Sequence, residues 1–498
     1  MKTLTFTALL FAAFVLPVLA QVPGPIPARP EKIQYGALKF DVPEADKYRF
    51  QLKNGTSVYL VEDHSLPLVN IAVTLRSGSF AEPKDKPGVA SLTATMMRKG
   101  GAGGLTAEQF DERADFLAVN INSYSGETQA GLSANSLSSQ LEPSLDLLFD
   151  LLKAPRFQAD RIEIEKGQLL ELIKQRNDDA GAILGREWGW LMYGEEFFAT
   201  RKITKAQLDS ITRDDLVAFH KATYRPEGMV IAVSGDVDAK AILAGLDKRF
   251  EGWRPEGSAV AWPPTAPTHV PKAGVYHVEK DIPQGKVNIG HLGAKHDAQW
   301  ENPDLFALDV MNDVLGGSGF TSRITKRVRS DEGLAYSAGS LYGVGVFWPG
   351  VFRIFFQTKN STVAYAAKLS LAEMGRIQTE PVSDSELSTA KNASIETFPR
   401  NFESAGKIAS LFASDDYLGR PHAYWGKFRD NVRKVGPADV QRVAKSYLAP
   451  DQVVFLIVGK WADIEKGDPD GKASMKEFFG GQVTHLPLRD PLTLQPIK

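Results

Sequence analysis

The sequence contains two copies of one folding unit, and this repeat constrains the fold more than any other feature. The segment ITRDDLVAFHKATYRPEGMVIAVSGDVD (211–238) resembles VGPADVQRVAKSYLAPDQVVFLIVGKWAD (435–463). Each copy has the pattern of an amphipathic helix, a Pro turn and a β-branched strand that ends on Gly. Four residue pairs match at one offset of 224: Asp215 with Asp439, Lys221 with Lys445, Pro226 with Pro450, and Gly235 with Gly459. VNIAVTL (69–75) and VNIGHLG (287–293) match at an offset of 218, so we predict a duplicated domain.

A segment rich in Pro and Gly, GWRPEGSAVAWPPTAPTHVPKAG (252–274), separates the two copies. Its composition is typical of an extended, semi-stiff linker. We therefore expect an N-terminal domain over 45–252, a linker over 253–273, a C-terminal domain over 274–465 and a tail over 466–498. The duplication and the Pro-rich join predict a half-clamshell.

Short β-branched runs and long amphipathic helices predict an α+β fold. Each domain combines clustered strands with helices such as LEPSLDLLFDLLKA (141–154) and DRIEIEKGQLLELIKQ (160–175). This pattern favours an antiparallel-rich sheet with helices packed on one face over a doubly wound sheet. The expected strands are Ser57–Val61, Val69–Leu75, Met229–Val233, Val275–Val278, Phe352–Gln357 and Val453–Val458.

The N-terminus has the features of a secretory signal peptide over residues 1–20. Met1-Lys2 gives a positive start, LTFTALLFAAFVL (4–16) is an apolar run too short to span a bilayer comfortably, and Val18-Leu19-Ala20 fits a cleavage site. A signal anchor that stays in the membrane is the alternative. The chain has no cysteine, which excludes disulfides, thiol nucleophiles and a lipid-modified N-terminal Cys. We expect export to a Gram-negative periplasm, or secretion, without membrane insertion after cleavage.

The composition and the absence of common motifs exclude several classes of function. Lys and Arg number 58 against 60 Asp and Glu, so nothing indicates a nucleic-acid partner. None of the eight histidines forms an H-x-x-x-H motif, and no G-x-S-x-G elbow, P-loop or dinucleotide fingerprint is evident. The glycine-rich LGGSG (315–319) lacks the Lys of a phosphate loop, and we interpret it as a tight turn entering a helix.

Three segments together resemble the pitrilysin/insulinase family of zinc metallopeptidases, the inverzincins. LKNGTSVYLVEDHSLPLVNIAVTLRSGSFAEPKDKPGVA (52–90) resembles the family's first hairpin and its approach to the zinc helix. YRPEGMVIAVSGDVD (224–238) is similar to the strand that closes the family's first domain, and VLGGSGFTSRITKRVRSDEGLAYSAGS (314–340) to a signature of its second domain. The resemblance covers nearly the whole mature chain and implies two insulinase-like domains.

The resemblance also shows that the zinc motif is degenerate. Active members have H-x-x-E-H after Gly-Val-Ala, because residues four apart share a helix face and grip one zinc. Ser91, Ala94 and Thr95 occupy those places, and Leu172 occupies that of the third ligand, a Glu on a later helix. Alanine offers no donor atom, and neutral hydroxyls are poor zinc ligands beside imidazole or carboxylate. Glu171 lies one residue away, a rotation of about 100° around a helix, and should face elsewhere. We expect no metal in this chain.

A second part of the family's machinery is intact. Active members use an Arg and a Tyr seven residues apart, and the pattern R-x-x-x-G-L-A-Y is present from Arg329 to Tyr336. A guanidinium orients a substrate carbonyl or carboxylate, and a phenol donates to a developing oxyanion. The alternative is that Arg329 is a solvated helix charge and Tyr336 a ring in the core of a strand.

Loss of the zinc set with retention of the Arg/Tyr pair resembles the non-catalytic subunits of heterodimeric family members. The resemblance implies that Arg329 and Tyr336 act at the zinc site of a homologous partner chain, with peptide or unfolded protein as substrate. Zinc is then the partner's cofactor. A stand-alone structural or peptide-binding protein derived from the fold is the second hypothesis, and an enzyme of unrecognised chemistry is the third.

Overall fold

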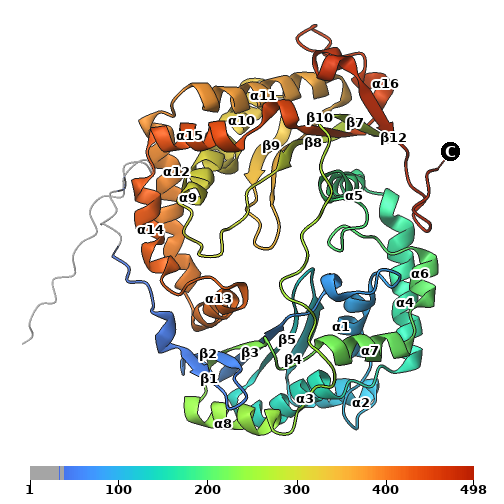
Figure 1. Ribbon diagram of the computed structural model, residues 1–498, viewed down its shortest axis with the longest axis vertical. Helices are drawn as coiled ribbons and strands as arrows, with labels where there is room; N and C mark the ends of the chain where they lie inside the picture. Colours follow the sequence, from blue (N-terminus) through green and yellow to red (C-terminus); the bar gives the residue numbers. More distant parts are fainter. Residues whose placement is uncertain (1–32, 34–38, 498) are drawn as a thin grey trace, which may run out of the picture. The chain divides into compact units, whose positions relative to one another are not determined.

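The chain folds around two six-stranded sheets flanked by helices, as the computed structural model in Figure 1 shows. The structure describes Ile33 and residues 39–497, so the predicted signal peptide (1–20) lies outside the described residues. From Val42 onward the chain is one compact unit. The α+β prediction is therefore confirmed, and each half of the chain supplies one sheet.

The first sheet has the strand order β1-β2-β6-β3-β5-β4, in which only β2 and β6 run parallel. Burial alternates along β3, where one face packs on the core and the other is open. The last strand in this order, β4, forms a free edge of the sheet. The bounds are β1 Arg49–Gln51, β2 Ser57–Glu62, β3 Leu68–Leu75, β4 Asn120–Ser125, β5 Ala130–Leu137 and β6 Val230–Gly235.

The second sheet repeats this topology in the order β12-β7-β11-β8-β10-β9. Its parallel pair β7 with β11 corresponds to β2 with β6, and the antiparallel pairs that follow correspond as well, whereas β12 adds a second parallel pair with β7. The matching connections confirm the duplication. The outermost strand differs, because β1 precedes its sheet in the chain whereas β12 follows its sheet. The bounds are β7 Gly274–Glu279, β8 Gln284–Leu292, β9 Ala335–Tyr342, β10 Val351–Lys359, β11 Val454–Gly459 and β12 Val483–Leu486.

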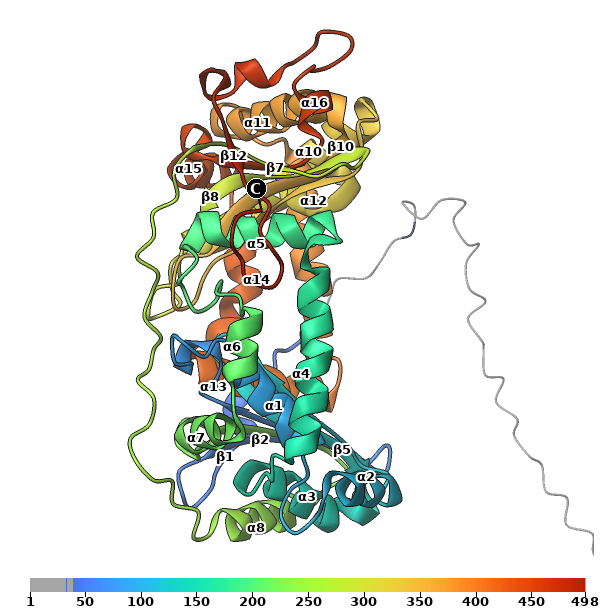
Figure 2. The same ribbon diagram turned by 90° about the vertical axis from the view of Figure 1, so that its right-hand side faces the viewer.

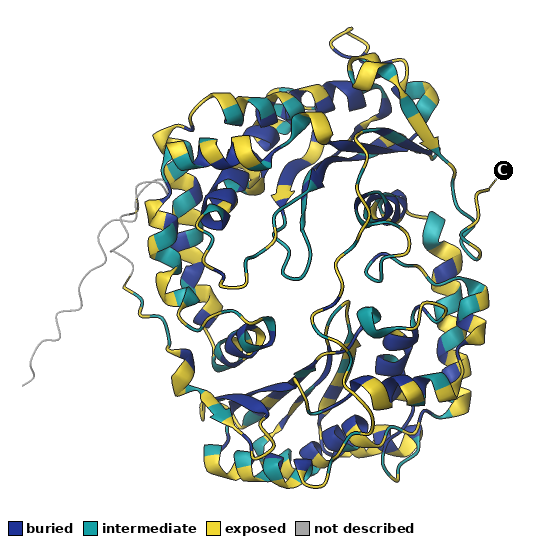
Figure 3. Cartoon of the chain, viewed as in Figure 1, coloured by how far each residue is buried: buried dark blue, intermediate teal, exposed yellow. Residues whose placement is uncertain are grey.

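Helices cover the core face of each sheet, and their buried stripes face inward in Figure 3. Several begin with a capping box, as at Thr106, Thr212 and Ser383, which satisfies the free N–H groups of the first turn. Apart from α5 (Ala180–Tyr193), the helices of the first half are α1 Val89–Lys99, α2 Ala107–Phe116, α3 Leu141–Lys153, α4 Ala159–Lys174, α6 Lys205–Ser210, α7 Arg213–Thr223 and α8 Ala239–Phe250, of which α4 and α6 lie beside the sheet (Figure 2). In the second half they are α9 Asp304–Asn312, α10 Arg323–Thr325, α11 Val363–Thr379, α12 Asp384–Thr397, α14 Tyr424–Lys434, α15 Pro437–Tyr447 and α16 Trp461–Ile464.

Two helices depart from the expectation that helices lie on one face only, because each packs on the sheet of the other half. Helix α5 (Ala180–Tyr193) belongs to the first half, yet its buried residues pack against β7 and β11 of the second sheet. Helix α13 (Ala405–Leu418) belongs to the second half and contacts β2 and β6 of the first sheet (Figure 1). Amphipathic periodicity indicates which face of a helix is buried, but not which sheet buries it.

The segments expected to be linker and tail both contact the folded halves. The linker runs as extended chain from α8 to β7 (Figure 2), and Arg225 donates to the carbonyls of Glu256 and Gly257 at 2.7 and 3.1 Å. Beyond 465 the chain adds β12 to the second sheet, and the carbonyl of Arg489 accepts from Asn177 Nδ2 at 2.7 Å. The second sheet therefore extends past the expected boundary. Within the described part of the chain, no helix combines the length and apolar character needed to cross a bilayer.

Candidate functional site

The helix that carries the degenerate zinc motif is α1, and its start is fixed by an acidic side chain. Gly88 has φ +89° and precedes the first turn, a conformation that favours glycine. The Glu82 carboxylate accepts hydrogen bonds from the backbone N–H of Gly88 at 2.9 Å and of Ala90 at 3.0 Å. Burial raises the pKa of Glu82 to about 7 despite these bonds. The local sequence thus sets the helix direction without any metal.

The side chains at the zinc positions do not form a metal site. Ser91 is exposed, Thr95 is half-buried, and Ala94 is buried in the core. Leu172 on α4 is 63% exposed, and the neighbouring Glu171 bonds Lys174 at 2.7 Å. This donor set of two neutral hydroxyls does not fit Zn²⁺, which binds imidazole, thiolate and carboxylate. Among residues 39–497, no three His, Asp or Glu side chains are placed to hold a metal ion.

Arg329 and Tyr336 lie together, and a third residue joins them. Arg329 is in η8 (Lys326–Asp331) and Tyr336 is near the start of β9. The guanidinium carbon of Arg329 lies 4.4 Å from the ring centre of Phe320 and 4.6 Å from that of Tyr336. Tyr336 is 85% exposed and Phe320 is 65% exposed, so neither ring belongs to the core. A cation held by two exposed rings has a fixed position and remains accessible to another molecule.

The glycine-rich segment before this cluster has a packing role that its sequence pattern does not reveal. Residues 313–317 form a wide helical turn, and a Cβ on Gly316 would lie 2.3 Å from the backbone nitrogen of Ser340 in β9. Only glycine permits this close approach to the strand. The predicted turn at LGGSG is therefore also a contact with the strand that carries Tyr336. Phe320 follows it at once, and its exposure could not be predicted from the pattern.

A buried ion pair holds the short helix between Phe320 and Arg329. Arg323 in α10 donates from Nε to Glu386 Oε1 at 2.6 Å and from Nη2 to Glu386 Oε2 at 3.0 Å. Ser383 donates to the same carboxylate, which caps α12. These hydrogen bonds, chiefly those from Arg323, lower the pKa of Glu386 to about 2. The bidentate geometry links α10 to α12. It therefore fixes the position of α10, the helix between Phe320 and Arg329.

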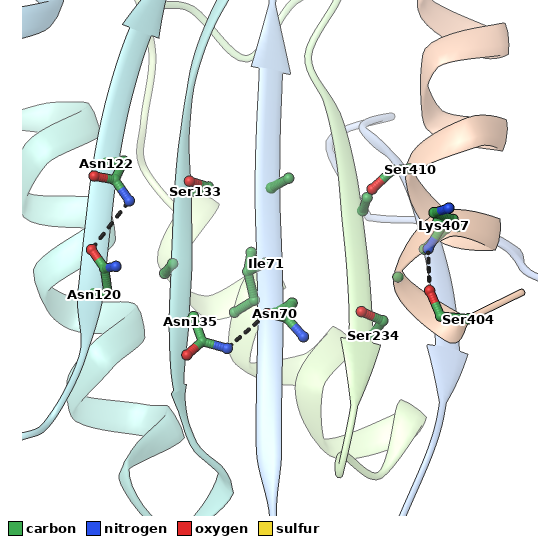
Figure 4. A pocket seen from close by; sticks show the side chains of 15 residues that line it. Asn70, Ile71, Asn120, Asn122, Ser133, Asn135, Ser234, Ser404, Lys407 and Ser410 are labelled. Carbon is green, nitrogen blue, oxygen red and sulfur yellow. Dashed lines mark hydrogen bonds between the residues drawn. The ribbon is translucent and has the colours of Figure 1, made fainter. Parts of the chain in front are cut away.

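A polar groove lies on the open face of the first sheet, next to the free edge formed by β4. Figure 4 shows its floor, where Asn120, Asn135 and Asn70 are cross-strand neighbours on β4, β5 and β3. Asn135 Nδ2 donates to Asn70 Oδ1 at 2.7 Å. Ser404, which caps α13, and Lys407 and Ser410 of that helix form a wall of this cavity of about 490 Å³.

No carboxylate lines the groove, and its one cation, Lys407, pairs with Glu403 at 2.6 Å. Amide and hydroxyl groups donate and accept hydrogen bonds alike, so the groove suits an uncharged ligand rich in hydrogen-bonding groups.

Models of two domains of one protein family match successive parts of the chain. Insulinase (peptidase family M16) matches residues 57–185, and the peptidase M16 inactive domain matches residues 210–394. Among curated relatives, the non-peptidase homolog YmxG of Helicobacter pylori is 25% identical over 408 residues, 80% of this chain and 90% of that protein. An uncharacterized zinc protease of Streptomyces coelicolor is 24% identical over 351 residues, 67% of this chain and 72% of that protein.

Solved structures share the fold. The peptidase M16 inactive domain from Pseudomonas fluorescens superposes with a TM-score of 0.74 at 24% identity, covering 83% of this chain and 97% of that one. The periplasmic protease PqqL from Escherichia coli superposes with a TM-score of 0.72 at 15% identity, covering 83% of this chain and 45% of that one. With both family matches, two sheets of one topology and the signature around Arg329, the chain belongs to the insulinase (peptidase M16) family.

Proposed function

We propose that this chain is the non-catalytic subunit of an exported heterodimeric zinc metallopeptidase. It binds peptide or unfolded protein and lends Arg329 and Tyr336 to the zinc site of a homologous partner chain. The name of the Helicobacter pylori relative, a non-peptidase homolog, supports a non-catalytic role. The structural neighbour PqqL is a periplasmic protease, and this likeness, together with the sequence of residues 1–20, supports export.

The main observation behind the proposal is that the first half lacks the zinc ligands while the second half keeps the Arg/Tyr pair. The zinc positions hold side chains that cannot ligate zinc, whereas Arg329 and Tyr336 are in contact and exposed. Among the described residues no carboxylate forms an ion pair with Arg329, so its charge is available to a substrate. Tyr336 extends its hydroxyl away from the core, where it can donate to an oxyanion.

The test is a steady-state assay of the chain reconstituted with a zinc-bearing homologue from the same organism. Tyr336→Phe should lower turnover about 100- to 1000-fold, the usual cost of one lost oxyanion donor. Arg329→Ala should also raise the apparent KM, because it removes an orienting contact. Arg327→Ala, a neighbour on the same helical segment that pairs with Glu332, is the matched control.

Assembly of the variants is measured in parallel by analytical ultracentrifugation. If Tyr336→Phe and Arg329→Ala assemble and cleave like the wild type, the pair is structural and the proposal is wrong. If both variants fail to assemble, the residues belong to the subunit interface and not to the chemistry.

A stand-alone peptide-binding protein is the second candidate, and the neutral groove beside the free edge of β4 favours it. An edge strand can pair with an extended peptide, and amide side chains can bind its polar groups. Peptide binding by the chain without any partner, unaffected by Arg329→Ala, would support this candidate over the first.

A further inference from the structure

A second cavity, of about 300 Å³, lies at the junction of the two halves, away from the zinc positions and the groove of Figure 4. We call it the α5 cavity. Its walls come from the turn between β4 and β5, from one face of α5, from the chain after α5 and from the loop between β9 and β10. The residues that the argument uses are Glu127, Gly185, Arg186, Tyr193, Lys202 and Trp348.

The shape of the α5 cavity is preformed. Gly185 leaves the helix face open, since a Cβ there would meet no atom within 4 Å. Trp348 is held edge-on against Phe197 and Phe198, with ring centres 5.3 Å apart in both cases. Tyr193 donates its hydroxyl proton to the Pro349 carbonyl at 2.9 Å, which fixes the same loop. A rigid aromatic wall with an open helix face is the geometry of a small-molecule site.

Opposite charges line the α5 cavity without meeting. Glu127 and Lys202 attract each other, yet no ion pair within 4.0 Å joins them. Burial raises the pKa of Glu127, and burial followed by the charge of Arg176 lowers the pKa of Lys202, while both residues keep an exposed surface that a ligand can reach. Within the described chain, neither side chain has a hydrogen-bond partner.

The guanidinium beside these charges is also incompletely paired. Arg186 is 6% exposed, and it donates from Nε to Glu187 at 3.0 Å and from Nη1 to Asn177 at 3.1 Å. Its Nη2 has no partner among the described residues. A buried guanidinium N–H without a partner is costly in the empty protein. A ligand carboxylate would offset this cost and would also attract Lys202, and a ligand ammonium would pair with Glu127.

We propose that the α5 cavity binds a small α-amino-acid zwitterion, either a free amino acid or a dipeptide. The ligand carboxylate faces Lys202 and Arg186, the ammonium faces Glu127, and an apolar or aromatic side chain packs on Trp348 and Tyr193. A simple anion would leave Glu127 unpaired, and a simple cation would leave Lys202 unpaired. The inference goes beyond the proposed function and requires no partner chain. Peptide hydrolysis is the class of reaction that releases such molecules.

The first test is calorimetric titration of the full mature chain with three ligands that share the phenylalanine side chain and differ in the charged groups they carry. They are phenylalanine, phenylalanine amide, which lacks the carboxylate, and N-acetylphenylalanine, which lacks the ammonium. Phenylalanine should bind, and each derivative should bind about 10- to 100-fold more weakly, since hydrogen bonds to charged groups are the strong ones. Equal binding of all three, or no binding of phenylalanine and its dipeptide at millimolar concentration, overturns the proposal.

Two variants then test which protein side chain binds each charged group of the ligand. Lys202→Met should clearly reduce the difference between phenylalanine and its amide, with Arg186 retaining part of it, and Glu127→Gln should remove the difference between phenylalanine and its N-acetyl derivative. Lys248→Met and Glu251→Gln, exposed positions at the end of α8, are the matched controls and should leave both differences unchanged. Discrimination that persists undiminished in Lys202→Met and Glu127→Gln would place the ligand elsewhere and refute the site. The wild-type ligand series remains decisive even if a variant fails to fold.

Discussion

Replacing Glu386 by Ala should destabilise the second half of the chain, because the change leaves a buried guanidinium without its partner. The Arg323 side chain is 6% exposed and the Glu386 side chain 25% exposed. The pKa of Glu386 falls from an ordinary 4.5 to about 2, chiefly because Arg323 donates to it. At about 1.36 kcal/mol for each tenfold change in proton affinity, this corresponds to about 3 kcal/mol. Breaking a buried pair costs about 3–5 kcal/mol, and we expect a loss in that range.

The assay is urea unfolding followed by hydrogen exchange at α10 and α12. Glu396→Ala, an exposed position on the same helix, is the control and should change the free energy of unfolding by less than about 0.5 kcal/mol. The double variant Arg323→Met with Glu386→Leu should recover most of the loss, since no charge is then left unpaired. Unchanged stability of Glu386→Ala would refute the conclusion that this pair anchors α10.

The same pair predicts a pH dependence with a definite sign. A carboxylate whose pKa is lower in the folded protein stabilises the fold above its unfolded pKa, and this contribution disappears as the pH falls. The stability advantage of the wild type over Glu386→Gln should therefore be full above pH 4.5 and decline toward pH 2. An advantage that stays constant over this interval would contradict the assignment.

Four further predictions concern the metal, the helix exchange, the glycine contact and a buried histidine. Elemental analysis of the purified mature chain should find no stoichiometric zinc, and one zinc per chain that is lost on mutating a histidine would contradict this. Trp188→Ala should lower the free energy of unfolding by about 3–5 kcal/mol in urea titrations, because its ring packs between α5 and the second sheet. Gly316→Ala should increase hydrogen exchange along β9 by displacing Ser340. Burial lowers the pKa of His277, so the protection factors of the β12 amides, which correct for the intrinsic exchange rate, should fall as the pH drops below 6.5.

The apolar strands could be predicted from the sequence, and the polar strands could not. The run expected at Ser57–Val61 is β2 (Ser57–Glu62), because a buried β-branched segment leaves a clear pattern. β4 has the sequence NINSYS, and its open face carries asparagine, so its apolar alternation is weak. β12 follows the predicted domain end and pairs across the chain with β7, a long-range contact that no local pattern encodes.

The candidate site residues also differ in whether the sequence could identify them. A motif of eight residues singled out Arg329 and Tyr336, and the structure adds that the two side chains are in contact. Glu127 and Lys202 come from distant parts of the chain, and only tertiary packing on α5 brings them to one cavity. Their side chains follow no motif, so sequence analysis could not find them.

The exchange of α5 and α13 between the two sheets bears on how the chain arose. Ala405, where α13 begins, lies 225 positions after Ala180, where α5 begins, so the two helices are copies of each other and each serves the opposite sheet. This is the arrangement of a two-fold symmetric pair of single-sheet polypeptides that have swapped one helix. Joining two such copies through residues 253–273 would produce the topology of this chain. The second half alone would expose the apolar sheet face that α5 covers, and the first half alone would lose its contact with α13. We therefore expect that the two halves, produced as separate polypeptides, regain the fold only by complementing each other.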